Sequence, residues 1–184
     1  MRYLDEVRPS LRAARTPEEW GSRQRLTIEW LGGNVGRTRI REVELIADER
    51  AESTGEGRGV SPGHTFLAGF GFSHMTQWGR AAAACSVEIM SLTEEIRASF
   101  DRRGEYLHDE GYAHPGFTEI TFVVRIESGS DHQLLRRFVS WAERSPPHAT
   151  LRRATRLVGE FLVNGEPLAT AVYHADRTDW THHR

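Results

Sequence analysis

The chain contains no lysine, since all 24 of its basic residues are arginine. They stand against 26 acidic residues, so the net charge is −2, and there is no basic excess with which to bind nucleic acid or an anionic membrane. A single cysteine, Cys85, excludes an internal disulfide and is typical of a reducing cytoplasm. The sequence lacks an apolar run of about 20 residues that could span a membrane, and charged residues follow Met1 where a signal peptide would be apolar. We therefore expect a cytoplasmic protein whose partners include neither nucleic acid nor a membrane.

The least polar stretch of the sequence, residues 61–85, predicts a long helix. Ser61 can cap its first turn, and Pro62 suits the first helical position, where its missing N–H costs nothing. From Phe66 onward, apolar side chains cover all sides of this helix, which is typical of a buried one. Gly69, Gly71 and Gly79 lie inside this helix, each costing about 1 kcal/mol relative to alanine, and they indicate close approach to another backbone. We expect the rest of the chain to fold around this core helix.

Alternation of apolar and polar residues predicts strands on both sides of the core helix. Two of them flank a glycine-rich turn at residues 32–36 and form a predicted hairpin, and two others flank Asn164-Gly165, a strong turn signal. The predicted strands cover residues 25–30, 37–46, 86–100, 117–128, 157–162 and 167–174.

Helix-start signals locate the shorter helices. Thr16-Pro17, followed by two glutamates, predicts a short helix near the N-terminus. Asp131 can cap an amphipathic helix, and Ser145-Pro146 ends that helix and begins another. The order of elements predicts an α+β domain with helices on one side of an antiparallel sheet. The predicted parts are an N-terminal extension (1–24), this domain (25–174) and a polar tail (175–184).

The core-helix stretch Ser-Pro-Gly-His-Thr-Phe-Leu-Ala-Gly-Phe-Gly-Phe-Ser resembles a motif of the OsmC/Ohr superfamily, the osmotically inducible and organic-hydroperoxide-resistance proteins. That motif runs roughly Asn/Ser-Pro-x-Glu/Gln-Leu-Leu/Phe-Ala-Ala-x-x-Ala/Gly-x-Cys, and Pro62 and Ala68 match it. A second family block, Ser-Pro-Val-x-x-Thr-Leu, resembles residues 145–151. The resemblance implies antiparallel sheets around a long buried central helix, with two chains intertwined into an obligate homodimer that has two sites at its interface.

The same resemblance implies where a site would lie. The family's peroxide-reducing cysteine falls on Ser73 and its second cysteine on Ser145, so both redox cysteines are missing. Because these positions can form a disulfide in the family, we expect the two hydroxyls to face each other. His74 is adjacent to Ser73, and His148 follows Ser145 by three residues on the same helical face.

We predict Ser73, His74, Ser145 and His148 as the catalytic group, if the protein is an enzyme. Serine and histidine can supply a nucleophile and a base, but the sequence shows no carboxylate to orient the histidine. The alternative is that each serine merely replaces a cysteine of similar volume and forms a hydrogen bond. The predicted ligand-binding residues are Arg58, in a loop beside a helix N-terminus that favours anions, His64, Phe70 and Trp78.

The histidines and the cysteine do not indicate a metal or redox centre. His64 and His74 are about 15 Å apart along a helix and cannot bind one metal within a single chain. Cys85 lies about 18 Å beyond the family's reactive position, and a lone cysteine is usually an inert apolar group. We predict no cofactor and no metal, while a metal held by both chains or by residues of different elements stays an alternative.

Two functions remain open. The first is binding of a small aromatic or carbonyl-containing molecule in a dimer-interface cleft, and any catalysis there would be cofactor-independent and non-redox, of the isomerase, lyase or hydrolase type. The alternative is a thiol-dependent organic hydroperoxide reductase of the family's usual kind, against which the missing cysteines count. The expected partners are a second copy of the chain and a small-molecule ligand.

Overall fold

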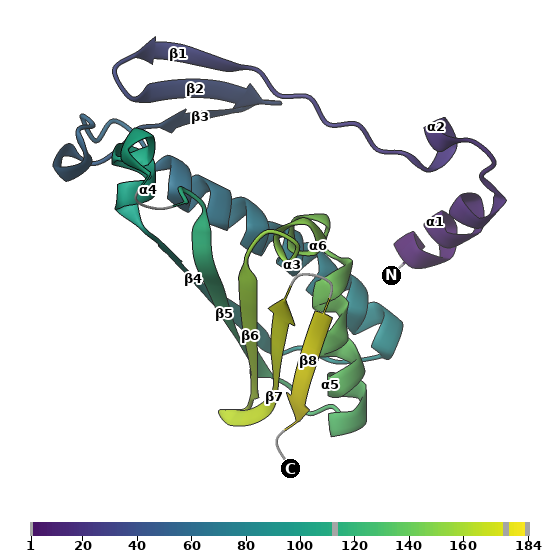
Figure 1. Ribbon diagram of the computed structural model, residues 1–184. Helices are drawn as coiled ribbons and strands as arrows, with labels where there is room; N and C mark the ends of the chain where they lie inside the picture. Colours follow the sequence, from purple (N-terminus) through teal and green to yellow (C-terminus); the bar gives the residue numbers. More distant parts are fainter. Residues whose placement is uncertain (1, 112–113, 175–176, 183–184) are drawn as a thin grey trace. The chain divides into compact units, whose positions relative to one another are not determined.

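The computed structural model describes residues 2–111, 114–174 and 177–182, and the chain divides into two compact units, residues 1–69 and 70–184. The long predicted helix is α3 (Pro62–Cys85), which begins in the first unit and ends in the second (Figure 1). Within the described ranges, no helix combines the length and the apolar character needed to cross a membrane.

The first unit contains two helices and a three-stranded antiparallel sheet of order β1-β2-β3. Thr16 and Pro17 start the second helix as predicted. The prediction of one strand over residues 37–46 is wrong, because Arg41 adopts a left-handed conformation (φ 55°) and turns the chain, so that Ile40 pairs with Val43. The elements are α1 (Arg2–Ala13), α2 (Pro17–Trp20), β1 (Ile28–Gly32), β2 (Val35–Ile40), β3 (Val43–Ala47) and a 3-10 turn (Ala51–Ser53).

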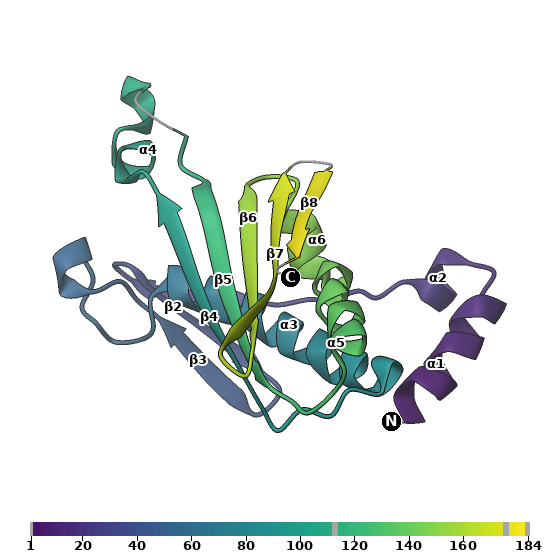
Figure 2. The same cartoon turned by 90° about the horizontal axis from the view of Figure 1, so that it is seen from below.

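The second unit is built on a five-stranded sheet of order β4-β5-β6-β7-β8 (Figures 1 and 2). Part of the predicted polar tail forms its last strand. The strands are β4 (Ser91–Phe100), β5 (Phe117–Glu127), β6 (Arg156–Val163), β7 (Glu166–His174) and β8 (Arg177–His182). The other elements after α3 are α4 (Arg102–Tyr106), α5 (His132–Val139), α6 (Pro146–Leu151) and 3-10 turns at His108–Glu110 and Ser140–Arg144.

The α+β class is as predicted, with one difference in the sheet. Neighbouring strands are antiparallel except β5 and β6, which are parallel. Parallel neighbours need a long crossover, and α5 and α6 supply it. Asp131 caps α5 by accepting the Gln133 N–H at 2.7 Å, and Ser145 caps α6 by accepting the His148 N–H at 3.3 Å.

The strand predicted from residue 86 begins only at Ser91. Ser86 is left-handed (φ 55°), and the Val87 N–H donates to the Ala82 carbonyl at 2.9 Å, so this segment ends the helix and does not start the strand. The partly covered face of β4 carries Leu92, Glu94, Ile96 and Ala98, which places a carboxylate in an otherwise apolar row.

In the second unit the core lies between one face of the sheet and the helices α3, α5 and α6 (Figures 1 and 2). Gly159 of β6 lies opposite Phe122 of β5, and a Cβ at position 159 would overlap the phenyl ring. In the single chain α3 is not buried on all sides, and burial of its remaining sides by a second copy stays a prediction. One side of it is buried, while Phe72, for example, is 72% exposed. The buried residues of α3 are Phe70, His74, Gln77, Trp78 and Ala81.

Candidate functional site

Two serine hydroxyls face each other in the second unit. Ser73 projects from α3 and Ser145 from the N-terminus of α6, and their Oγ atoms are 2.9 Å apart. Ser145 is buried and also accepts the His148 N–H as the cap of α6. Each hydroxyl therefore has a hydrogen-bond partner, and neither is bonded to an imidazole nitrogen in the part of the chain that the structure describes.

Beside the serines runs a buried chain of three ionisable side chains. Glu94 of β4 approaches His74 of α3, with Oε1 at 2.6 Å from Nδ1. The other ring nitrogen of His74, Nε2, is 3.0 Å from Nδ1 of His148 on α6. Both imidazoles are fully buried, and the Glu94 side chain is 1% exposed. Helix α3, strand β4 and helix α6 thus each contribute one member of a continuous hydrogen-bonded chain.

The two ends of this hydrogen-bonded chain, Glu94 and His148, differ in their outer partners. At one end the second oxygen of Glu94, Oε2, accepts the indole N–H of Trp78 at 3.2 Å. At the other end, Nε2 of His148 is buried and has no hydrogen-bond partner among the described residues. An unpaired buried polar atom costs about 1–3 kcal/mol, so it is a feature that a purely structural network would be expected to avoid.

Aromatic rings enclose His148. The Tyr173 ring meets it edge-on with centroids 4.4 Å apart, and Phe70 and Phe122 lie at 6.1 and 5.8 Å. Burial in this apolar shell, together with His74 and Arg152, lowers the pKa of His148 to about 3. At neutral pH His148 is therefore an uncharged imidazole with one buried nitrogen that has no hydrogen-bond partner among the described residues.

The structure brings together the four residues predicted as catalytic, Ser73, His74, Ser145 and His148. Of the predicted ligand-binding residues, Phe70 and Trp78 are both 2% exposed. Phe70 packs on His74 at 4.4 Å between centroids, and Trp78 packs on Phe138 at 5.3 Å. In the single chain they support the two histidines from inside the core.

The other two predicted ligand-binding residues, Arg58 and His64, belong to the first unit. The Arg58 backbone N–H donates to Asp48 at 2.9 Å, and its guanidinium lies 3.8 Å from the Glu56 carboxylate. Both acidic neighbours disfavour an anion at Arg58. His64 Nδ1 is 2.5 Å from the Ser61 hydroxyl in the first turn of α3. Their proposed participation in the site stays a prediction.

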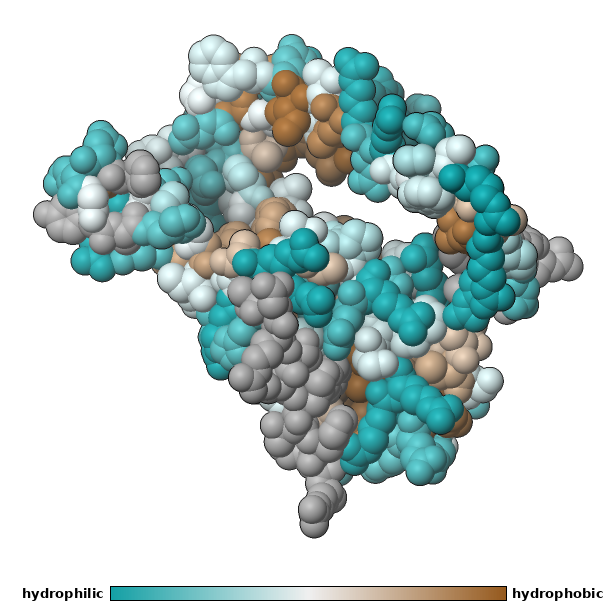
Figure 3. All heavy atoms as spheres, turned by 45° about the vertical axis from the view of Figure 1, so that its right-hand side comes forward, coloured by the Kyte–Doolittle hydropathy of each residue, from teal (hydrophilic) through white to brown (hydrophobic). Residues whose placement is uncertain are grey.

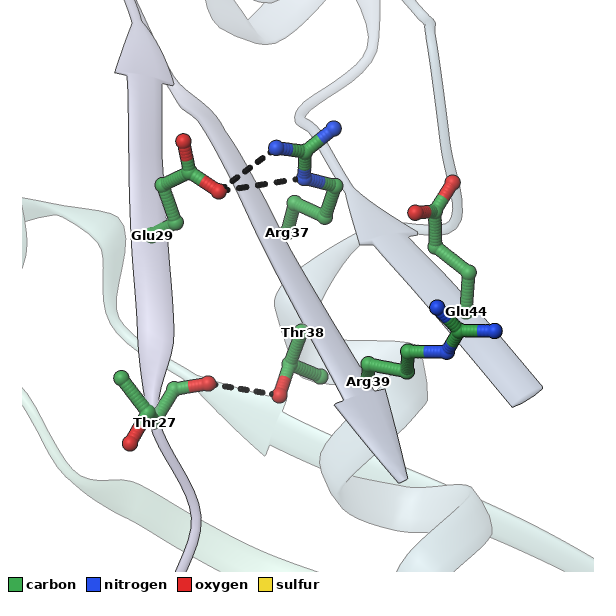
Figure 4. A pocket seen from close by; sticks show the side chains of 6 residues that line it. All are labelled: Thr27, Glu29, Arg37, Thr38, Arg39 and Glu44. Atoms are coloured by element: carbon green, nitrogen blue, oxygen red, sulfur yellow. Dashed lines mark hydrogen bonds and ion pairs between the residues drawn. The ribbon is translucent and has the colours of Figure 1, made fainter. Parts of the chain in front are cut away.

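The three-stranded sheet has an open hollow of a different character, lined by charged residues and threonines (Figure 4). Glu29 and Arg37 from neighbouring strands point toward each other and form an ion pair at 2.6 Å. Because these charges neutralise each other and no histidine lines the hollow, it offers no chemistry like that around His148. Its other lining residues are Thr27, Thr38, Arg39 and Glu44.

Sequence reasoning missed Glu94, the carboxylate that orients His74. The sequence did contain a signal for Glu94, because it lies at the period of two that places it on the same side of the strand as Leu92, Ile96 and Ala98. A charged residue in an apolar row must find a buried partner, because isolated buried charge is very unfavourable. In the described residues, no three histidine, cysteine or acidic side chains are grouped so as to hold a metal ion.

Comparison with known proteins identifies the fold. No protein-family model and no curated protein sequence matches the chain. Among solved structures, an OsmC-like protein from Mycoplasma pneumoniae is similar with a TM-score of 0.66 and 18% identity, over 78% of this chain and 98% of its own. An organic hydroperoxide resistance protein OsmC from Legionella pneumophila is similar with a TM-score of 0.57 and 16% identity, over 77% and 98%.

A third similar structure is an organic hydroperoxide resistance protein from Vibrio cholerae, with captopril bound in one of its active sites. It has a TM-score of 0.54 and 17% identity, over 81% of this chain and 97% of its own. The chain therefore has the fold of the OsmC/Ohr superfamily, as the sequence motifs indicated. It has this fold with serines at the two positions that match the motif cysteines.

Proposed function

We propose that this protein is an OsmC-like homodimer that binds a small aromatic or carbonyl-containing molecule in a cleft at the dimer interface, and that its site moves protons and not electrons. The observation that supports this most is the hydroxyl pair at 2.9 Å together with the buried imidazole of His148, whose Nε2 has no hydrogen-bond partner among the described residues. Reduction of a hydroperoxide by the family's route needs a thiolate and a sulfenate intermediate, which a serine hydroxyl cannot form.

The proposed ligand follows from the groups around His148. The Ser73–Ser145 pair has a hydroxyl proton that could be donated to a carbonyl oxygen, and the aromatic shell favours an unsaturated, weakly polar molecule. An uncharged imidazole can accept a proton from such a molecule without a cofactor. That the Vibrio cholerae protein holds captopril in an active site supports a small-molecule site in this fold. The chemistry we propose is cofactor-independent isomerisation, lyase cleavage or hydrolysis in the cytoplasm.

An exposed apolar face in the first unit supports the homodimer. The strand register places Ile28, Thr38 and Leu45 side by side on one face, and Trp30, Ile40 and Val43 share it. Trp30 is 75% and Ile28 66% exposed, and Figure 3 shows hydrophobic side chains gathered on this unit. Large exposed apolar patches mark interaction surfaces, and two-fold homodimers are the commonest oligomers.

Ligand binding is tested by calorimetry on the purified full-length protein, with cinnamate, benzoate and cyclohexenone as probes. We expect at least one probe to bind the parent. Ser73→Ala and His148→Ala, and Arg58→Ala if the predicted role of Arg58 holds, should each weaken it by about 1–3 kcal/mol. Binding that is unchanged in all three variants would place the ligand elsewhere and overturn the proposed site.

The competing function is a thiol-dependent hydroperoxide reductase, which the names of the Legionella and Vibrio proteins favour. We expect no consumption of cumene or tert-butyl hydroperoxide above a buffer control in the presence of a dithiol. Robust turnover that disappeared in Cys85→Ser would establish the competing function instead.

A further inference from the structure

The hydrogen bonds of the buried chain have a direction, which follows from what each group can donate or accept. The indole N–H of Trp78 can only donate, so Oε2 of Glu94 must accept from it. The other oxygen of Glu94 lies 2.6 Å from Nδ1 of His74, which is a short distance typical of a hydrogen bond to a charged group. With an ionised carboxylate as the acceptor, Nδ1 of His74 carries the proton.

The proton on Nδ1 of His74 also fixes the direction of the hydrogen bond between His74 and His148. A neutral imidazole has one protonated and one bare nitrogen, so Nε2 of His74 is an acceptor once Nδ1 carries the proton. The contact of 3.0 Å between Nε2 of His74 and Nδ1 of His148 then requires the proton to be on His148. Its remaining nitrogen, the buried and unpartnered Nε2, is left with a bare lone pair.

We propose that Glu94 is the positioning residue that sets the direction of these hydrogen bonds, with Trp78 bonded to its other oxygen, so that His148 presents an unprotonated Nε2 as the base of the site. Its use as a base rests on the proposed function, whereas the tautomer does not. The donor-only N–H of Trp78 selects an end only where an amide replaces the carboxylate, because both ends of Glu94 itself are oxygens.

The arrangement lets the site take up a proton without charging His148. A proton from the bound molecule adds to Nε2 of His148, and the proton on Nδ1 of His148 passes across the 3.0 Å bond to Nε2 of His74. His148 ends neutral, the positive charge rests on His74 beside the Glu94 carboxylate at 2.6 Å, and the bound molecule is left as its conjugate base. The low pKa of His148, about 3, is consistent with a residue that relays the proton but does not hold the charge.

Replacement of Glu94 by glutamine should reverse the direction of the hydrogen bonds from residue 94 through His74 to His148. The indole N–H of Trp78 still needs an oxygen, so the amide carbonyl turns toward it and the amide NH₂ faces His74. Nδ1 of His74 then accepts, its Nε2 donates to Nδ1 of His148, and Nε2 of His148 becomes protonated. Trp78→Phe leaves the carboxylate in place and should keep the original direction. In Trp78→Phe/Glu94→Gln the carbonyl is free to face His74, and the original direction should return.

The experiment is NMR spectroscopy of the full-length protein labelled with ¹⁵N at histidine, at a pH of about 8.5, where ordinary histidines are neutral. Protonated and bare ring nitrogens have well separated shifts, and His148→Gln identifies the His148 signals among those of the nine histidines. We expect a bare Nε2 in the parent, a protonated Nε2 in Glu94→Gln, and a bare Nε2 again in Trp78→Phe and in the double variant.

A protonated Nε2 of His148 in the parent would overturn the assignment, and this result does not depend on whether any of the positioning variants folds. An unchanged tautomer in folded Glu94→Gln, or a double variant that keeps the reversed one, would overturn the role of Glu94 or Trp78. If the tautomers are as expected but no probe binds, the proposed function fails while the proposed direction of the hydrogen bonds stands. If a probe binds but the tautomer is unchanged in Glu94→Gln, the proposed function stands while the role of Glu94 in setting the direction fails.

Discussion

Ser73 of α3 and Ser145, the cap of α6, are 72 residues apart in sequence, yet their Oγ atoms are 2.9 Å apart. Such proximity needs matched Cβ directions as well as matched positions, and the same requirement governs a disulfide. The serine pair therefore has the proximity that a disulfide requires, with hydroxyls in place of thiols.

We predict that Ser73→Cys/Ser145→Cys, made in a Cys85→Ser background, forms a disulfide on mild oxidation. Closing a loop of this length should stabilise the oxidised form by up to about 4 kcal/mol in the chain-entropy model. The checks are a thiol titration and denaturant unfolding with and without reductant, with Ser73→Cys alone as the control. Two titratable thiols after oxidation would show that the backbone holds the pair apart.

His148 should make stability depend on pH. Its pKa of about 3 in the folded protein, caused by burial and by His74 and Arg152, lies below the ordinary 6.5. The unfolded chain therefore binds a proton that the folded chain does not, so stability is full above about pH 6.5 and falls as the pH approaches 3. The greatest slope from one such group is about 1.4 kcal/mol per pH unit.

This dependence is measured by urea unfolding at several pH values between 7.5 and 4.5. We expect His148→Gln to flatten the curve by about 1 kcal/mol per pH unit near pH 5.5. His174→Gln, which changes an exposed histidine of the same sheet, is the matched control and should leave the slope unchanged. Parallel curves for the parent and His148→Gln would mean that His148 titrates normally.

At the scale of elements, the end of α3 decides where β4 begins. Ser86 occupies the left-handed position after the helix, which glycine prefers because it has no Cβ. The short link from there to Ser91 sets the register in which Glu94 faces the core. A one-residue slip would turn Glu94 away from His74.

Ser86→Gly should therefore stabilise the protein by about 1 kcal/mol, because it relieves the left-handed backbone. Ala84→Gly, two residues earlier and still helical, should destabilise it by a similar amount. Thermal unfolding midpoints measured side by side test the pair. Equal effects of both glycines would show that the turn at position 86 is not strained.

At the scale of the whole molecule, the apolar face of the three-stranded sheet should be covered by a second copy of the chain. We expect light scattering to give about 42 kDa, twice the chain mass of 20.9 kDa. Ile28→Glu places a charge on this face and should shift the protein toward monomer, whereas Arg39→Glu places the same charge on the opposite face and should not. A monodisperse parent monomer at micromolar concentration would contradict the homodimer.

Much of the molecule followed from local sequence. The start signals at Ser61-Pro62, Thr16-Pro17 and Asp131 predicted helix starts, since each acts on the first turn of its own helix, although the Thr16 side chain makes no capping hydrogen bond. The hairpin at Asn164-Gly165 formed as expected because both residues adopt the left-handed backbone that such a turn requires. The OsmC-like motifs were sufficient to predict the fold and the place of Ser73 and Ser145.

Other features were decided only in three dimensions. Periodicity shows which residues of a strand point inward but not what lies opposite them, so it could not reveal that Glu94 meets His74 or that His74 meets His148. The parallel pairing of β5 with β6 depends on how α5 and α6 cross the sheet, which no short stretch encodes. The sequence itself specifies the imidazoles and the carboxylate, while their order in one line of hydrogen bonds arises from contacts between residues up to 74 positions apart.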